Sequence, residues 1–189
     1  MAGKNIVVAI TGASGSVLAK HALLHLFLQD VLVHLIVSDT GRKIYKYEVE
    51  ESIEDTIQIG KNVILYNNED LFAPIASGSF NVSGMIILPC SVSTASKIAC
   101  GIGDTLINRA AACCIKEKVP IVISPRETPL SSIVLENLRT LSENGVFIMP
   151  PVPSFYDKSH DYNKILNAMV GRMLSKIGIE NTLYKRWSE

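Results

Sequence analysis

Short apolar runs, unbroken by polar residues and alternating with segments of helical periodicity, are the feature that most constrains the fold of this chain. Strands with one face in water alternate apolar and polar residues, whereas strands covered by helices on both faces of a parallel sheet are apolar throughout. The runs therefore predict buried parallel strands. These are expected at Ile6–Ile10, Val33–Val37, Met85–Leu88, Ile121–Ile123 and Val146–Ile148, with a further short strand at Val63–Tyr66.

The segments between these runs carry apolar stripes at helical spacing, as expected for helices that pack on a sheet. The stripes comprise Ala19, Ala22, Leu23 and Leu26, then Leu106, Ala110, Cys113 and Cys114, then Val134, Leu138 and Leu141 after the candidate N-caps Ser131 and Ser132. A last helix is expected from about Asp161 to Ile177. This order predicts an α/β protein with a doubly wound, mainly parallel, Rossmann-like sheet and helices on both faces. Such sheets bind ligands beyond the carboxyl ends of their strands.

The 189 residues show no repeat and no linker. We therefore expect one domain over residues 1–189, with a C-terminal helix and tail from about residue 157. The stretch from Val49 to Ser83 is expected to be irregular apart from its short strand, with a surface loop at residues 73–79.

Composition excludes several classes of function. Eighteen basic and eighteen acidic residues cancel, so there is no electrostatic support for a nucleic-acid or membrane partner. No apolar run is long enough to span a bilayer, and the first is too short for a signal peptide. The cysteines show no metal or redox spacing and are expected to be small buried residues of a reduced, cytoplasmic protein; they are Cys90, Cys100, Cys113 and Cys114. The lack of net charge is a weak indication of a homo-oligomer.

The first predicted strand runs into Thr11–Gly15 and then into a helix. Small residues let the backbone approach an anion, the helix N-terminus offers N–H groups, and the Ser14 hydroxyl adds a donor. The pattern suits a mononucleotide phosphate better than the pyrophosphate of a dinucleotide. A tight turn without a ligand remains the alternative.

A second hydroxyl-rich turn, Ser91–Thr94, follows the run at Met85–Leu88. An N-cap explains one hydroxyl but not three. Two such turns at neighbouring strand ends predict a bound polar ligand.

The run at Ile121–Ile123 is followed by Pro125-Arg126-Glu127-Thr128-Pro129. Two prolines stiffen this loop around a cation and a carboxylate. An exposed Arg–Glu ion pair is the common explanation, and an acid–base site is the functional one.

Arg109 and Lys116 are seven residues apart and share the helix face opposite the apolar stripe. Spacing alone favours a solvated face at these two residues. His21 and His25 have the spacing of metal ligands but no third partner, so we expect no metal site. The sequence also lacks the carboxylate cluster that holds Mg²⁺ in prenyl-diphosphate enzymes.

These segments, in this order, resemble the UbiX-type flavin prenyltransferases over nearly the whole chain. The resemblance is carried by Thr11–Gly15, Ser91–Thr94, Asp104-Thr-Leu-Ile-Asn-Arg109-Ala-Ala, Lys116-Glu117, Pro125–Pro129, Met149-Pro150-Pro151, Phe155-Tyr156 and Arg186-Trp187. The Pro-Arg-Glu-Thr-Pro segment and the Met-Pro-Pro and Phe-Tyr segments are the most specific.

The resemblance implies an enzyme that joins the dimethylallyl group of dimethylallyl phosphate to N5 and C6 of reduced FMN. The product would serve a UbiD-type decarboxylase, and family members were formerly described as aromatic acid decarboxylases. The family also implies a homo-oligomer, a dodecamer with sites between subunits.

The resemblance also assigns residues to roles, position by position. The residues implied to bind FMN are Gly12, Ala13, Ser14, Ser38, Ser91, Val92, Ser93, Thr94 and Arg126. Those implied to bind the allylic phosphate are Arg109, Lys116, Tyr156 and Arg172, with Trp187 as a shield for the allylic group or an anchor for the tail. Glu127, Glu48 and Ser14 are implied as catalytic groups, with Glu127 assisting proton transfer.

One position departs from the family pattern, because Ala112 stands where an Asp is usual. Any hydrogen bond that this Asp supplies is absent here.

Two alternative functions remain. A flavin-dependent cysteine decarboxylase would share the fold but needs a catalytic His in a suitable setting. A non-catalytic FMN-binding subunit would not need Arg109, Lys116 and Glu127 together.

Overall fold

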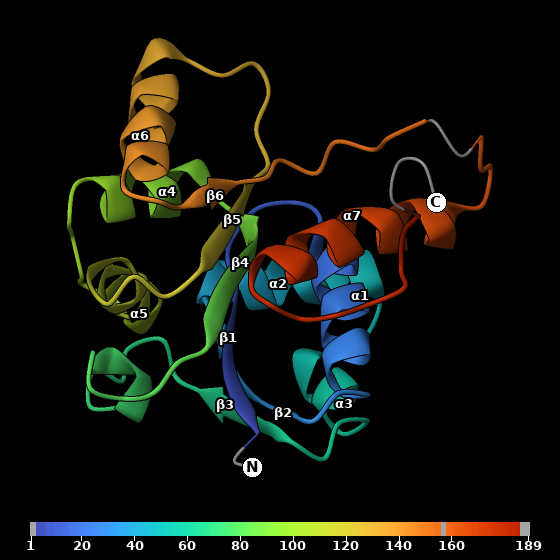
Figure 1. Cartoon of the computed structure of the whole chain (residues 1–189), viewed down its shortest axis with the longest axis horizontal. Coiled ribbons are helices and arrows are strands. Elements are labelled where there is room, and N and C mark those ends of the chain that lie inside the picture. Colours follow the sequence, from blue (N-terminus) through green and yellow to red (C-terminus); the bar gives the residue numbers. More distant parts are fainter. Residues whose placement is uncertain (1–2, 156–157, 186–189) are drawn as a thin grey trace.

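A computed structural model describes residues 3–155 and 158–185. Its strands form one open, wholly parallel sheet in the order β3-β2-β1-β4-β5-β6 (Figure 1). They are β1 (Lys4–Ile10), β2 (Val31–Val37), β3 (Val63–Tyr66), β4 (Gly84–Cys90), β5 (Ile121–Pro125) and β6 (Phe147–Ile148). The predicted doubly wound fold and all six predicted strands are confirmed, with differences of a residue or two at most ends.

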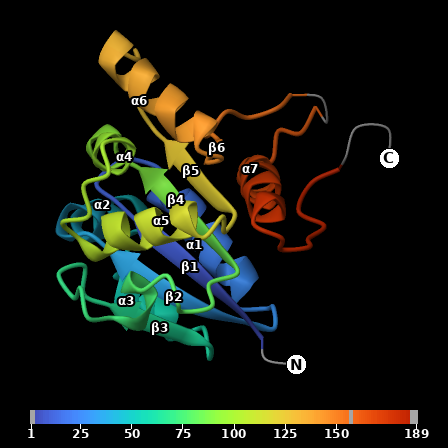
Figure 2. The same cartoon turned by 60° about the vertical axis from the view of Figure 1, so that its left-hand side comes forward.

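Helices cover both faces of the sheet (Figures 1 and 2). One face carries α1 (Ser16–Leu26), α2 (Asp39–Val49), α3 (Ile53–Ile57) and α7 (Tyr162–Lys176). The other carries the short 3-10 helix η1 (Pro74–Ala76), α4 (Val92–Ala99), α5 (Leu106–Lys116) and α6 (Ser132–Glu143). Strand β1 shows how one sequence fills two cores, because Ile6, Val8 and Ile10 pack on the first face while Val7 and Ala9 pack on the second.

The predicted helix ends and stripes are largely confirmed. Ser131 caps α6 by accepting a hydrogen bond from Val134 N, and Asp161 caps α7. The predicted stripes face the two cores, although Val134 is only partly buried. The stretch from Val49 to Ser83 is less irregular than predicted, since it contains α3 and η1. Helix α2 was not predicted either, because only Gly41 and Tyr45 of it are buried and no stripe is visible.

Two of the four cysteines, Cys90 and Cys114, are buried in apolar surroundings that raise the pKa of each thiol to about 12. Cys113 is buried as well, but Cys100 is exposed, which corrects the expectation that all four are buried. All four are free thiols. No helix in residues 3–155 and 158–185 is long and apolar enough to cross a membrane.

The strand order places the switch point of the sheet between β1 and β4. After β1 the chain moves to β2 through α1 on one face, and after β4 it moves toward β5 through helices on the other face. The connections that leave β1 and β4 therefore run to opposite faces, and doubly wound proteins bind ligands in the crevice at such a switch point.

Candidate functional site

Thr11 joins the two turns at the switch point. Its backbone N–H and its hydroxyl both donate to Pro89 O, at 3.2 and 2.9 Å. The hydroxyl oxygen also accepts a hydrogen bond of 2.7 Å from Ser91 N. The side chain is only 2% exposed. The turns after β1 and β4 therefore form one unit rather than two independent loops.

The turn after β4 presents donors suited to an anion. Ser91 caps α4, because its Oγ accepts from Thr94 N at 3.2 Å and lies 3.0 Å from Thr94 Oγ1. Within the described part of the chain, the N–H groups of Val92 and Ser93 have no partner. They open the first turn of α4, where unpaired N–H groups and the helix dipole favour a phosphate. A flavin phosphate fits this position.

At the N-terminus of α1, the position of an anion is occupied by the carboxylate of Glu48, a residue of α2. Its carboxylate accepts hydrogen bonds from Gly15 N at 2.9 Å and Ser16 N at 2.7 Å. In this structure the Gly15 and Ser16 N–H groups, which the sequence offered for a phosphate at the start of this helix, thus donate to Glu48. Helix α2 thus brings a predicted catalytic carboxylate next to Ser14, whose side chain is exposed. Gly15 itself has φ of 113°, a conformation that favours glycine.

Ser38 extends the crevice to the end of β2. Its N–H donates to Ile10 O at 3.0 Å, and its Oγ accepts from Gly41 N as the N-cap of α2. A Cβ on Gly12 would lie 2.7 Å from Thr40 Cγ2, so α2 begins in tight contact with the turn after β1. The predicted flavin-binding residues thus lie at adjacent strand ends.

Arg126 and Glu127 follow β5 at the same edge of the sheet. Arg126 N donates to Cys90 O at 3.2 Å, which fixes this loop beside the turn after β4. Both side chains are exposed, and neither takes part in an ion pair among the described residues. The Arg–Glu ion pair considered from the sequence does not form. Within residues 3–155 and 158–185 the Arg126 guanidinium thus has no carboxylate partner, and its backbone lies beside the turn after β4.

Arg109 and Lys116 lie on an exposed face of α5, as their spacing predicts. Arg109 Nε donates to Ala76 O at 2.9 Å. A guanidinium has five N–H donors, and the four Nη hydrogens of Arg109 have no partner in the part of the chain that the structure describes, so they are available for an anion. Lys116 Nζ lies 3.1 Å from Glu117 Oε1 in an exposed ion pair.

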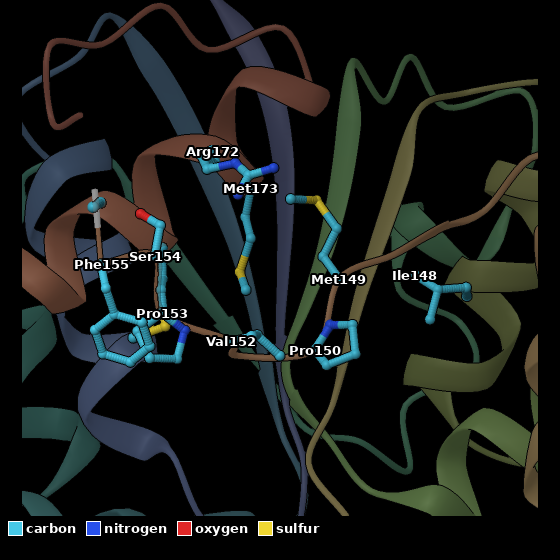
Figure 3. Close-up of a pocket in the computed structure, with 11 residues that line it drawn as sticks. Ile148, Met149, Pro150, Val152, Pro153, Ser154, Phe155, Arg172 and Met173 are labelled. Carbon is cyan, nitrogen blue, oxygen red and sulfur yellow. The ribbon is translucent and has the colours of Figure 1, made fainter. Parts of the chain in front are cut away.

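Arg172 lies on the other side of the sheet, on α7. It lines a cavity of about 590 Å³ together with Met149, Met169, Met173 and the segment that follows β6. Figure 3 shows Arg172 and Met173 facing that segment across the cavity. Because α5 and α7 cover opposite faces of the sheet, Arg172 lies on the opposite side of the sheet from Arg109 and Lys116 of the same chain. Tyr156 and Trp187 lie outside the described residues.

The candidate metal ligands are used in packing. His21 Nδ1 lies 2.8 Å from Asn167 Oδ1, which ties α1 to α7, and His25 lies near Gln29. No group of three or more possible metal ligands occurs within the described residues. Ala112 is half-buried on α5 and carries no polar atom in its side chain.

Sequence reasoning missed the contacts made by residues 73–79, which appeared only as a surface loop. The contact of Glu48 with the α1 N-terminus was equally hidden, because it joins residues 33 positions apart. Neither contact has a local sequence signal.

Comparison with known proteins gives a consistent result. The family model described as Flavoprotein matches residues 1–174. The chain is 44% identical to the flavin prenyltransferase UbiX of Thermoplasma acidophilum, over 96% of this chain and 99% of that one.

Two solved structures are similar over nearly the whole length. One is AnUbiX (PadA1) in complex with FMN and dimethylallyl pyrophosphate, with a TM-score of 0.93, 37% identity, and coverage of 99% of this chain and 98% of that one. The other is a dodecameric FMN-dependent Ubix-like decarboxylase from Escherichia coli O157:H7, with a TM-score of 0.92, 36% identity, and coverage of 98% and 100%.

Proposed function

Since this chain belongs to the Flavoprotein family, and within it to the UbiX-type flavin prenyltransferases, we propose that it transfers the dimethylallyl group of dimethylallyl phosphate to N5 and C6 of reduced FMN. The observation that carries the proposal is the pair of hydrogen-bonded turns at the switch point. There Thr11 fixes two turns, and α4 presents the free N–H groups of Val92 and Ser93. The same family membership makes a cysteine decarboxylase or a non-catalytic subunit the weaker alternatives.

The proposed flavin site comprises the strand ends around this crevice. The α4 N-terminus and the hydroxyls of Ser91 and Thr94 hold the flavin phosphate, and Arg126 adds a cation beside them. Ser38, Gly12, Ala13 and Ser14 complete the wall at β1 and β2. Bound reduced FMN supplies the nucleophilic N5 and C6. Glu48 is assigned to proton transfer there, which is supported by its hydrogen bonds to Gly15 N and Ser16 N beside Ser14.

The proposed role of the cations is to stabilise the leaving phosphate. When the allylic C–O bond breaks, the electron pair stays with the phosphate, and Arg109, Lys116 and Arg172 stabilise the charge that develops. One new bond would join N5, which loses its proton, to the allylic carbon that carried the phosphate. The second would join C6 to the far end of the prenyl group, whose double bond takes up one proton while C6 loses another, and Glu127 would assist proton transfer together with the released phosphate. Tyr156 and Trp187 are assigned to the phosphate and the allylic group by the resemblance alone.

We further propose that the site is completed between subunits of a homo-oligomer, a dodecamer as in the similar Escherichia coli protein. Arg109 and Arg172 lie on opposite faces of one chain, so a second copy is needed to bring such cations together. Phe72, Ile133 and Phe155 are 101%, 73% and 77% exposed, and large apolar side chains are enriched in the cores of subunit interfaces.

Each copy would act as one FMN-binding domain over residues 1–189. The free thiols support a reducing compartment such as the cytoplasm. A UbiD-type decarboxylase is the proposed recipient of the prenylated flavin.

The test is an anaerobic incubation of the protein with FMN, a reductant and dimethylallyl phosphate, followed by mass analysis of the released flavin. We expect the flavin mass to increase by one dimethylallyl group. A parallel reaction with dimethylallyl pyrophosphate shows which ester is preferred. Recovery of only unmodified FMN from folded, FMN-binding protein with both esters would overturn the proposal.

A further inference from the structure

Residues 73–79, between β3 and β4, lie along the face of α5 that carries Arg109 and Lys116; η1 is the green turn below α5 in Figure 1. The segment is anchored, because Ile75 and Ala76 are 1% and 7% exposed and pack in the same apolar cluster as α5. Beyond η1, Ser77 Oγ lies 2.9 Å from Ser79 Oγ and also accepts from Ser79 N. The segment is therefore a fixed surface beside α5.

The carbonyl oxygen of Ala76 binds the Arg109 side chain at its Nε atom. It accepts from Arg109 Nε at 2.9 Å and from Cys113 Sγ at 3.3 Å, which uses both of its lone pairs. The bond to Nε fixes the plane of the guanidinium while leaving the Nη atoms unpaired among the described residues. Arg109 is thus oriented before any anion binds.

Gly78 provides the space for the second cation. A Cβ at this position would lie 2.5 Å from Glu117 Oε1 and 2.9 Å from Lys116 Nζ. These two atoms are themselves 3.1 Å apart. The backbone of Gly78 is not left-handed, so the reason for glycine here is space and not conformation. The charged ends of Lys116 and Glu117 pack directly against bare backbone.

We propose that residues 76–78 are a positioning element for the phosphate-binding cations, with the Ala76 carbonyl orienting Arg109 and the bare backbone of Gly78 setting the place of Lys116. This inference rests on the proposed function, in which both cations hold the allylic phosphate. Long cationic side chains lose rotamer freedom when they bind an anion. Fixing them beforehand lowers that cost and strengthens binding.

The test is Gly78→Ala, compared with the wild-type protein. The new methyl group meets only the ends of flexible side chains, so the fold should tolerate it while Lys116 and Glu117 shift. We expect the KM for dimethylallyl phosphate to rise about fivefold or more, with kcat and the Kd for FMN changed less than about twofold. Calorimetric titration of dimethylallyl phosphate into the protein loaded with oxidised FMN should show the same weakening without any turnover.

Gly103→Ala is the matched control, since its methyl group would lie 3.8 Å from Arg109 Cα and Cδ, which is ordinary contact. It should leave KM unchanged. In a Lys116→Met background, Gly78→Ala should have little further effect if it acts through Lys116.

An unchanged affinity in Gly78→Ala, or an equal loss in the Lys116→Met background, would overturn the inference. A parallel loss of FMN binding would overturn it too, because the role would then be structural. If the wild-type protein fails to prenylate FMN, the proposed function fails, and the calorimetric comparison still decides whether Gly78 positions an anion-binding Lys116.

Discussion

The hydroxyl of Thr11 makes two hydrogen bonds at the switch point, one to each end of the β4 turn. Thr11→Val keeps the shape of the side chain but removes the buried hydrogen bond to Pro89 O and leaves Ser91 N without its acceptor. We expect a loss of about 1–3 kcal/mol in the free energy of unfolding, which is typical of a buried group left unpaired. FMN binding should weaken as well, because only the hydrogen bond from Thr11 N to Pro89 O then joins the two turns. Urea unfolding and fluorescence titration with FMN measure the two effects.

Thr140→Val is the control for this change. The Thr140 hydroxyl also donates a hydrogen bond, to Glu136 O at 3.1 Å, but on the exposed side of α6. The loss there should stay within about 0.5 kcal/mol and FMN binding should not change. Equal effects of the two substitutions would show that the Thr11 bridge has no special importance.

The acid–base chemistry of the site can be tested at a single residue, Glu127. Its side chain is exposed, so Glu127→Gln should not alter the fold. The amide cannot exchange a proton at neutral pH, and we expect kcat to fall about 100-fold with the Kd for FMN unchanged. Glu143→Gln, an exposed carboxylate on α6, is the control. An unchanged kcat in Glu127→Gln would remove this residue from the mechanism.

Helices α1, α2 and α3 are held together by one polar chain of contacts. Tyr45 OH lies 2.7 Å from Thr56 Oγ1, which donates to Glu51 Oε1 at 2.6 Å, and Lys20 Nζ lies 2.9 Å from the same oxygen. Burial raises the pKa of Tyr45 to about 12, so its hydroxyl remains neutral. The chain fixes the end of α2 that carries Glu48.

Tyr45→Phe should therefore cost about 1 kcal/mol in the free energy of unfolding, since it removes one buried hydrogen bond without creating a cavity. Hydrogen exchange should become faster in α2 and in the first turn of α1, because Glu48 is held less firmly there. Tyr47→Phe, two residues away and 86% exposed, should change neither quantity. The argument fails if the two variants behave alike.

The elements differ in how much of them the sequence predicts. Buried strands and α7 have strong local signals, namely apolar runs, a clear stripe and the Asp161 cap. Helices α2 and α3 lack a stripe because they cover the sheet through a few residues such as Tyr45 and Ile53. The strand-end turns were predicted as parts of a site. The contacts of Glu48 with α1 and of Arg109 with Ala76 depend on tertiary structure, so no local pattern predicts them.

The stability of the whole molecule should depend on the protonation of His34. This side chain is 2% exposed on β2, with Nδ1 2.9 Å from Tyr66 OH and Nε2 3.2 Å from Asn5 Oδ1. It therefore links three neighbouring strands. The Asn5 amide nitrogen donates to Asn81 O, so its oxygen accepts from the His34 ring, and this assignment gives a neutral ring with Nδ1 as acceptor. Burial lowers the pKa of His34 below the 6.5 of an exposed histidine.

A lowered pKa in the folded state means that the unfolded chain binds the proton more readily. The contribution of His34 to stability is therefore complete above about pH 6.5 and is lost as the pH falls through the folded-state pKa. Burial lowers the pKa of His25 as well, which acts in the same direction. Urea unfolding of the wild-type protein at pH 7.5 and 5.5 should show lower stability at pH 5.5.

His34→Gln should have a lower free energy of unfolding than the wild-type protein at pH 7.5, but that free energy should fall less on acidification. His160→Gln, at an exposed position, should keep the wild-type pH dependence. A pH dependence unchanged in His34→Gln would show that the acid sensitivity of the fold arises elsewhere.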